Sequence, residues 1–191
     1  MRLERRAAMA TLLAGRGDDL LVVPGLGSTT WDLAALGDDD RNFYLWGAMG
    51  GAAMIGLGLA LAQPKRRVAV ITGDGEMLMG MGSLATVAAQ AADNFAVAVL
   101  DNGQFGETGA QRSHTGLTTD LAAVAAACGW PSVSTLRTMA EVEAISPRLR
   151  RERLFTVIKI SPAEVPRFLP PRDGAKLTAR MHQALGIVGD P

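Results

Sequence analysis

The chain has 191 residues, with 19 basic and 19 acidic side chains and a single cysteine, Cys128. A chain of this length is expected to form one domain, residues 1–191, with a sizeable core. The balanced charge argues against nucleic acid as a partner, because such proteins carry a basic patch. One cysteine excludes an intramolecular disulfide, an iron–sulfur cluster and a cysteine-rich zinc site, and it fits a reducing, cytoplasmic compartment.

The first residues carry Arg2, Glu4, Arg5 and Arg6 without a long apolar run, which is not the pattern of a secretory signal. The apolar run at 48–62 contains four glycines and is too short to span a bilayer. We therefore expect a cytoplasmic protein that does not enter the membrane.

Apolar runs and helical patterns alternate along the first half of the chain. Apolar residues at helical spacing predict a covering helix over 2–14, ended by Gly15 and Gly17. The elements that follow are a strand at 19–23, a helix from about Trp31, a strand at 42–46, a buried helix at 48–62, a strand at 67–71, a helix at 77–92 and a strand at 95–100.

The second half continues the alternation. The expected elements are a helix at 118–129, a strand at 131–136, a helix at 138–149, a strand at 154–160 and a helix at 173–185. Thr138 and Glu141 form a capping box, and four prolines interrupt residues 161–172. The pattern predicts an α/β fold, with an open, mainly parallel six-stranded sheet and helices on both faces.

A glycine turn rich in hydroxyls, residues 24–30, follows the first strand. Gly25 and Gly27 resemble the first two glycines of the dinucleotide-binding fingerprint, but Thr30 stands where the third is needed. In either case the turn can donate backbone N–H groups and hydroxyls to a phosphate. Ser28, Thr29 and Thr30 are therefore phosphate-binding candidates, and helix capping alone is the alternative.

Polar side chains also end two neighbouring strands. Gly73-Asp74-Gly75 follows the strand at 67–71, and Asp101-Asn102 follows the strand at 95–100. Open α/β sheets bind ligands at the carboxyl ends of their strands. A carboxylate and a carboxamide beside a glycine-flanked helix N-terminus would suit an octahedral Mg²⁺ that also holds a phosphorylated ligand.

Gly73-Asp74-Gly75, then 25 residues, then Asp101-Asn102, resembles the Gly-Asp-Gly…Asn-Asn signature of thiamine diphosphate (TPP) enzymes. Asp101 replaces the first Asn, which is not the usual ligand. The resemblance implies Mg²⁺ held by the side chains of Asp74 and Asn102 and by the backbone carbonyl of Gln104. It also places Gly73, Gly75 and Glu76 beside the cofactor, although we expect the Glu76 carboxylate to bind backbone N–H groups rather than the diphosphate.

The segment from Gly47 to Gly51 resembles the family's second signature, Gly-x-(bulky apolar)-Gly. This resemblance implies that Met49 supports the bent cofactor and that the Gly47 carbonyl binds its 4′-amino group, whereas Met49 as plain core is the alternative. In the family a turn similar to the one containing Gly27, Ser28 and Thr29 contacts the diphosphate.

The loop at 103–115 is long, polar and rich in glycine, and such loops often carry function. The backbone N–H groups of Gly106 and Glu107 match a diphosphate contact in the family. Gln111, Arg112 and His114 could bind an anionic substrate or transfer protons, and an inert loop histidine is the alternative. We take Glu107, Gln111 and His114 as the catalytic candidates. Gly-Glu-Thr-Gly followed by Ser-His-Thr most resembles the small-subunit sulfopyruvate and phosphonopyruvate decarboxylase group.

The resemblance spans residues 20–160 and implies the diphosphate-binding domain of a TPP enzyme. No glutamate of the chain has the context of the pyrimidine-domain glutamate, so the expected partner is a separate subunit with a pyrimidine-binding domain. The first hypothesis is the TPP- and Mg²⁺-binding subunit of a decarboxylase acting on an anionic 2-oxoacid. The alternatives are a subunit of a TPP-dependent carboligase and a nucleotide-binding module without catalysis.

Overall fold

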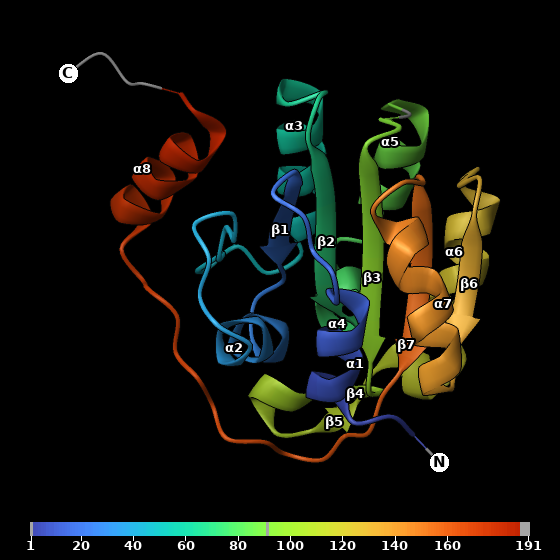
Figure 1. The fold of residues 1–191 in the computed structure, drawn as a ribbon. Coiled ribbons are helices and arrows are strands. Elements are labelled where there is room, and N and C mark those ends of the chain that lie inside the picture. The colour runs from blue at the N-terminus through green and yellow to red at the C-terminus, as the bar shows by residue number, and fades with distance from the viewer. Residues whose placement is uncertain (1, 91, 188–191) are drawn as a thin grey trace.

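The computed structural model describes residues 2–90 and 92–187, and its centre is a five-stranded sheet in the order β1-β2-β3-β7-β6 (Figure 1). All neighbouring strands in this sheet are parallel. The strands are β1 (Leu20–Pro24), β2 (Arg67–Gly73), β3 (Phe95–Asp101), β6 (Val133–Leu136) and β7 (Leu154–Lys159). The central strands β2 and β3 are buried on both faces, which explains their continuous runs of Val, Ile and Ala.

The α/β fold is as predicted, but the prediction of six strands is wrong because residues 42–46 form no strand. Asn42 makes one isolated parallel bridge with Val22, in which the N–H of Phe43 donates to the Val22 carbonyl at 2.9 Å. Tyr44 and Leu45 are buried nonetheless. The apolar pattern here reflects burial without a strand ladder, and Gly47 then turns the chain with a φ of 79°.

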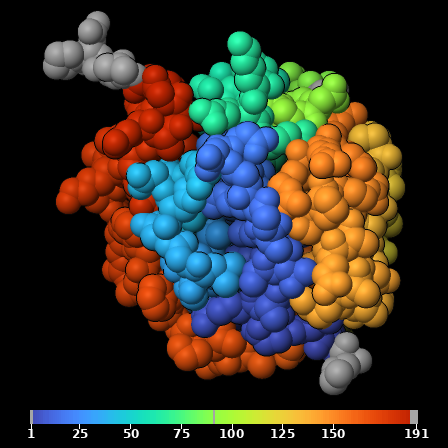
Figure 2. Space-filling view, viewed as in Figure 1, coloured from blue at the N-terminus to red at the C-terminus, as the bar shows by residue number. Residues whose placement is uncertain are grey.

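Helices cover both faces of the sheet. The strand side chains alternate between two cores, so that Leu21 and Val23 belong to one and Leu20 and Val22 to the other. The helices α1 (Arg5–Leu12), α2 (Ser28–Ala35) and α7 (Met139–Leu149) pack on the face that Figure 2 shows. The opposite face carries α3 (Ala52–Ala62), α4 (Asp74–Met79), α5 (Ser83–Gln90) and α6 (Leu121–Ala127).

The helix predicted at 77–92 is in fact two helices, α4 and α5, and α4 begins earlier, at Asp74. Gly80 ends α4 and packs against Gly50. Only glycine fits there, because a Cβ atom would lie 2.1 Å from the Gly50 carbonyl oxygen. Similarly, α2 begins at Ser28, earlier than predicted. The capping box of α7 is confirmed: Thr138 Oγ1 accepts from the Glu141 N–H, and the Glu141 carboxylate accepts from the Thr138 N–H.

The C-terminal segment runs along the carboxyl edge of the strands and then turns toward α8 (Gly174–Leu185), as Figure 1 shows. The Pro171 carbonyl accepts a hydrogen bond from Trp46 Nε1 at 3.1 Å. The guanidinium of Arg180 pairs with Asp38 at 2.6 Å, which fixes α8. Within the described residues, none of the helices has the length and apolar character that crossing a membrane requires.

A short antiparallel ribbon follows β3. It consists of β4 (Gln104–Phe105) and β5 (Gln111–Arg112), and two 3₁₀ turns, η1 (Gly106–Thr108) and η2 (His114–Gly116), complete this loop. The loop therefore returns to the carboxyl edge of the sheet, where the N–H of Ser113 donates to the Gly103 carbonyl at 2.9 Å.

Candidate functional site

A cavity lies at the carboxyl ends of β1, β2 and β3. Its walls come from the turn after β1, the start of α4, the end of β3 and the ribbon that follows. The structure thus brings together most of the predicted cofactor-binding and metal-binding residues, which are Ser28, Thr29, Met49, Gly73, Asp74, Gly75, Glu76, Asn102, Gln104, Gly106 and Glu107.

Two predicted residues, Gly27 and Gly47, do not line the cavity. Gly27 is the N-cap of α2 with a φ of 90°, and a Cβ atom there would lie 3.1 Å from the Glu107 side chain. Thr30 is fully buried and does not line the cavity. The hydroxyls of Thr29 and Thr30 both donate to the Gly25 carbonyl, at 2.7 and 2.8 Å, so they serve the turn itself.

Asp74 opens α4 and is 2% exposed. Its Oδ2 atom accepts hydrogen bonds from the hydroxyls of Ser113 and Thr115, the latter at 2.9 Å. Burial raises the pKa of Asp74, these hydroxyls oppose the rise, and the nearby Asp101 carboxylate adds to it. Among the described residues, the side chains that donate to Asp74 all use Oδ2, which leaves Oδ1 as the candidate atom for a ligand in the cavity.

Asp101, the altered position of the signature, is part of the scaffold. Its Oδ2 atom pairs with the Lys159 amine from the adjacent strand β7, and its Oδ1 atom accepts from Thr115 at 2.8 Å. Asp101 does not line the cavity, but the next residue does. The Asn102 Oδ1 atom accepts from the Gln104 N–H at 2.8 Å, which fixes the turn between the two predicted metal ligands.

Glu76 is 4% exposed, and its carboxylate joins two segments of the site. The Oε1 atom accepts from the N–H groups of Gly50 at 3.0 Å and Ala52 at 3.1 Å, at the start of α3. The Oε2 atom accepts from the Thr72 hydroxyl. Burial raises the pKa of Glu76, and the backbone hydrogen bonds oppose the rise. The carboxylate accepts from backbone N–H groups as predicted, and these belong to Ala52, the first residue of α3, and to Gly50 just before it.

Of the three catalytic candidates, only Glu107 lines the cavity. His114 and Gln111 are exposed, as is Arg112. Gln111 donates to the Thr108 carbonyl at 2.8 Å, and the His114 ring packs edge-on against Phe105. Gln111 lies in β5 and His114 in η2, and neither side chain lines the cavity.

Sequence reasoning missed two charged residues of the cavity, Arg5 and Asp32. The helix containing Arg5 was expected only to cover the sheet. The two residues are 27 positions apart, yet Arg5 Nε donates to Asp32 Oδ2 at 2.5 Å. No local pattern signals such a pair, since only the packing of α1 against α2 brings them together.

The donor set of the cavity suits a hard divalent cation. Asp74 supplies a carboxylate, Asn102 a carboxamide and Gln104 a backbone carbonyl, all of them oxygen ligands. Over residues 2–90 and 92–187 there is no group of three His, Cys, Asp or Glu side chains placed to hold a metal. The oxygen set just described contains only one such side chain, so that finding does not argue against it.

Residues 27–160 match the family model "Thiamine pyrophosphate enzyme, C-terminal TPP binding domain", and the chain belongs to this family. Among solved structures, benzoylformate decarboxylase from Polynucleobacter necessarius has the same fold, with a TM-score of 0.75 and 17% identity over 87% of this chain and 34% of that one. A 2-oxoglutarate:ferredoxin oxidoreductase from Magnetococcus marinus gives a TM-score of 0.67 at 15% identity, covering 94% of this chain and 72% of that one.

Two curated relatives are more similar to this chain in sequence than the solved structures above. The "Phosphonopyruvate decarboxylase" of Streptomyces viridochromogenes is 50% identical over 129 residues, which are 68% of this chain and 32% of the relative. The "Sulfopyruvate decarboxylase subunit beta" of Methanothermobacter thermautotrophicus is 43% identical over 130 residues, or 68% of this chain and 69% of the relative. The match therefore covers about a third of the first relative and about two thirds of the second.

Proposed function

We propose that this chain is the TPP- and Mg²⁺-binding subunit of a two-chain 2-oxoacid decarboxylase of the sulfopyruvate and phosphonopyruvate decarboxylase type. The observation that carries the proposal is the meeting of Asp74, Asn102 and Gln104 at one cavity with the N-terminus of α2. Family membership and the names of the relatives support it.

Each wall of the cavity has a role in this proposal. Asp74 and Asn102 hold the metal with their side chains and Gln104 with its backbone carbonyl. The turn at Ser28 and the backbone at Gly106 and Glu107 face the diphosphate. When bound, TPP supplies the carbon nucleophile and the electron sink that decarboxylation of a 2-oxoacid needs.

An apolar surface beside the cavity supports a partner subunit. Gly50 and Met79 are in close contact, which brings the segment after Gly47 against the end of α4. Exposed apolar side chains occur in these two segments and on α3: Met49, Met54, Met79 and Met81. A cluster of this kind is typical of a surface that another chain covers. We propose that a pyrimidine-domain subunit covers it, in line with relatives named as subunit beta.

The substrate in this proposal is a 2-oxoacid with a second anionic group, as the names of the relatives suggest. Glu107 is the catalytic candidate that already lines the cavity. Gln111 and His114 would act only if their side chains turn toward the cavity or if the partner places substrate next to them. We expect the enzyme to work in the cytoplasm, since the chain's one cysteine fits a reducing compartment.

The proposed function is tested by combining the chain with a pyrimidine-domain subunit. The purified chain, alone and mixed with a pyrimidine-domain subunit, would be assayed for CO₂ release from sulfopyruvate and from phosphonopyruvate. We expect Mg²⁺-dependent TPP binding, and decarboxylation only in the mixture. Steady-state turnover by the isolated chain at the rate of the mixture would contradict the two-chain proposal. Titration with TPP and with NAD separates the enzyme from a nucleotide-binding module, because the module would prefer NAD.

A further inference from the structure

Arg5 occupies an unusual place for an arginine. It opens α1, is 8% exposed and lines the cavity that contains Asp74 and Asn102. Its Nε atom donates to Asp32 Oδ2 at 2.5 Å. For the two Nη atoms, the structure shows no protein acceptor within hydrogen-bonding distance among residues 2–90 and 92–187. The side chain as a whole is buried and lines the cavity, so these donors are available to a ligand there.

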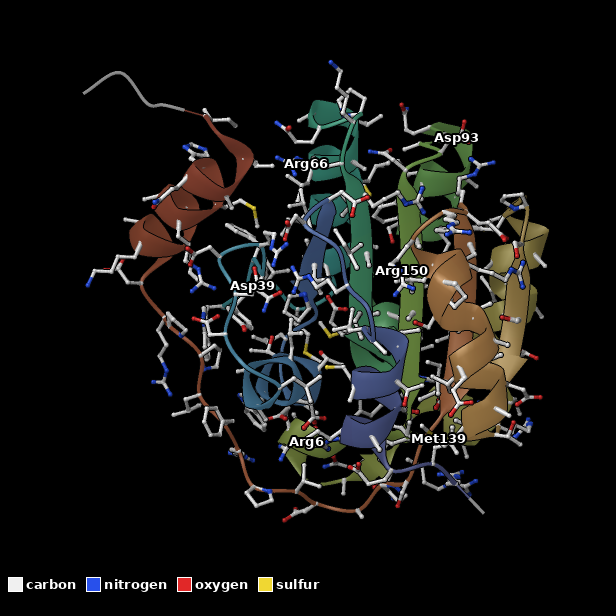
Figure 3. All side chains as sticks on the ribbon, viewed as in Figure 1. Arg6, Asp39, Arg66, Asp93, Met139 and Arg150 are labelled. Atoms are coloured by element: carbon white, nitrogen blue, oxygen red, sulfur yellow. The ribbon has the colours of Figure 1, made fainter. Side chains whose placement is uncertain are left out.

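The charges of Arg5, Arg6 and Asp32 indicate that the ligand of Arg5 is an anion. Asp32 is fully buried and also accepts from Arg6, whose Nε and Nη2 atoms lie 3.2 and 3.0 Å from Oδ1. The Asp32 carboxylate therefore contacts the guanidinium groups of both Arg5 and Arg6, and the three side chains together carry a net charge of +1. Arg6 directs Nη2 also to the Pro166 carbonyl at 2.8 Å, toward the C-terminal segment and away from the cavity. Figure 3 shows Arg6 between α1 and α2.

Within the described residues, Arg5 is the only basic side chain that lines the cavity, whereas the lining acidic residues are Asp32, Asp74, Glu76 and Glu107. A diphosphate would bring further negative charge, and one Mg²⁺ offsets only two charges. A further cation would offset part of the remaining charge, and Arg5 is the lining side chain that could supply it. An arginine held by a carboxylate is well suited to this task because its fork of donors keeps a fixed direction.

We propose that Arg5 binds the terminal phosphate of the diphosphate, with Asp32 as the positioning residue that aims the guanidinium. Asp32 is on α2, one turn after Ser28 and Thr29, so it holds Arg5 beside the helix N-terminus that faces the same group. This proposal rests on the proposed function, since it concerns the cofactor of that function. It adds a cationic contact from the N-terminal helix.

The neighbouring arginine provides a matched control. Arg5→Gln and Arg6→Gln each remove one guanidinium from Asp32, but only Arg5→Gln removes a cation that lines the cavity. Calorimetry with Mg²⁺ would measure the affinity of the full chain for TPP, thiamine monophosphate and inorganic pyrophosphate. We expect Arg5→Gln to weaken TPP and pyrophosphate by about tenfold or more, to leave thiamine monophosphate within about twofold, and to be partly rescued by Arg5→Lys.

The outcomes separate the alternatives. Arg6→Gln should bind TPP as the wild type does, while thermal unfolding reports whether each variant is folded. If Arg5→Gln does not fold, Arg5→Lys still gives the test, because it keeps the charge and loses the fork. Unchanged TPP affinity, or a change only in the KM for the 2-oxoacid in the complete enzyme, would overturn the proposal. A wild-type chain that binds neither TPP nor pyrophosphate would instead show that the proposed function has failed.

Discussion

Two carboxylates in the first turn of α4 show how one short segment serves two purposes. Asp74 and Glu76 are 2% and 4% exposed, and burial raises the pKa of both. Glu76 uses both oxygens within the protein, on the N-terminus of α3 and on Thr72. Asp74 uses only Oδ2, on loop hydroxyls. The difference teaches that burial alone does not identify a metal ligand, and the proposal that Asp74 binds the metal rests on its Oδ1 atom, which the loop hydroxyls do not use.

The largest effect is expected at Asp74, where Asp74→Ala removes the proposed metal ligand. We expect Mg²⁺-dependent TPP affinity to fall by at least about 100-fold, since even groups that only support a ligand are worth 10- to 100-fold. The fold should persist, because the substitution also removes a buried charge. Calorimetry of TPP binding checks the affinity and circular dichroism checks the fold. Asp74→Asn, of similar shape, is the control for charge. Unchanged affinity in Asp74→Ala would refute the metal assignment.

At Glu76 the order of the effects should be reversed, with stability reduced more than affinity. Glu76→Ala leaves the N–H groups of Gly50 and Ala52 and the Thr72 hydroxyl without their acceptor. We expect the free energy of unfolding to fall by about 2 to 3 kcal/mol, measured by urea denaturation. Glu76→Gln should recover part of this loss, because its amide oxygen can still accept from the backbone. Equal stability of Glu76→Ala and the wild type would mean that these hydrogen bonds contribute little.

The same contrast explains what the sequence could and could not predict. The strands β2 and β3 and the residues at their ends follow from local apolar runs that stop at polar residues, so the sequence could place Asp74 and Asn102 at the same edge of the sheet, where both line the cavity. Metal binding by these residues stays a prediction. The backbone partners of Glu76 lie 24 and 26 residues away, at and just before the start of α3. The pairing of Arg5 with Asp32 likewise depends on how two helices pack. Such contacts leave no periodicity in the chain.

Residues 42–46 show the opposite kind of error, because their local apolar pattern predicted a strand that the structure does not contain. Tyr44 and Leu45 are as buried as strand residues, but a single bridge to Val22 replaces the ladder. Hydrophobic periodicity reports burial and does not distinguish a strand from an extended segment that packs beside one. His114 and Gln111 were chosen for residue types that suit catalysis, but residue type does not show whether a side chain lines the cavity, and these two do not. Their catalytic role stays a prediction.

A smaller effect is expected at Thr115, whose hydroxyl lies between the carboxylates of Asp74 and Asp101. Its Oγ1 atom is 2.9 Å from Asp74 Oδ2 and 2.8 Å from Asp101 Oδ1. Thr115→Val keeps the shape and removes the donor, so we expect a loss of about 1 to 2 kcal/mol in unfolding free energy. TPP affinity should also fall a few-fold, by analogy with groups that orient metal ligands. Thr118→Val, at an exposed threonine, is the control and should change neither quantity.

The smallest effect is expected at Asp39, a carboxylate of the surface loop whose pKa shifts in the opposite direction. Hydrogen bonds from Arg41, at 2.6 and 2.8 Å, lower the pKa of Asp39 to about 2 despite partial burial. A lowered pKa means that its stabilisation is complete above the unfolded value of about 4 and is lost as the pH falls through about 2. The contribution should be below about 1 kcal/mol, because the pair is partly solvated.

Asp39→Asn should remove that part of the acid dependence. Urea midpoints at pH 6 and at successive values down to pH 2, about the folded pKa of Asp39, would be compared for the wild type and the variant. We expect the variant to be slightly less stable at pH 6 and the difference to shrink toward pH 2. Asp40→Asn is the control, since Asp40 is more exposed and lies 3.8 Å from Arg180. Parallel acid profiles for the wild type and Asp39→Asn would show that the ion pair with Arg41 gives the fold no net support.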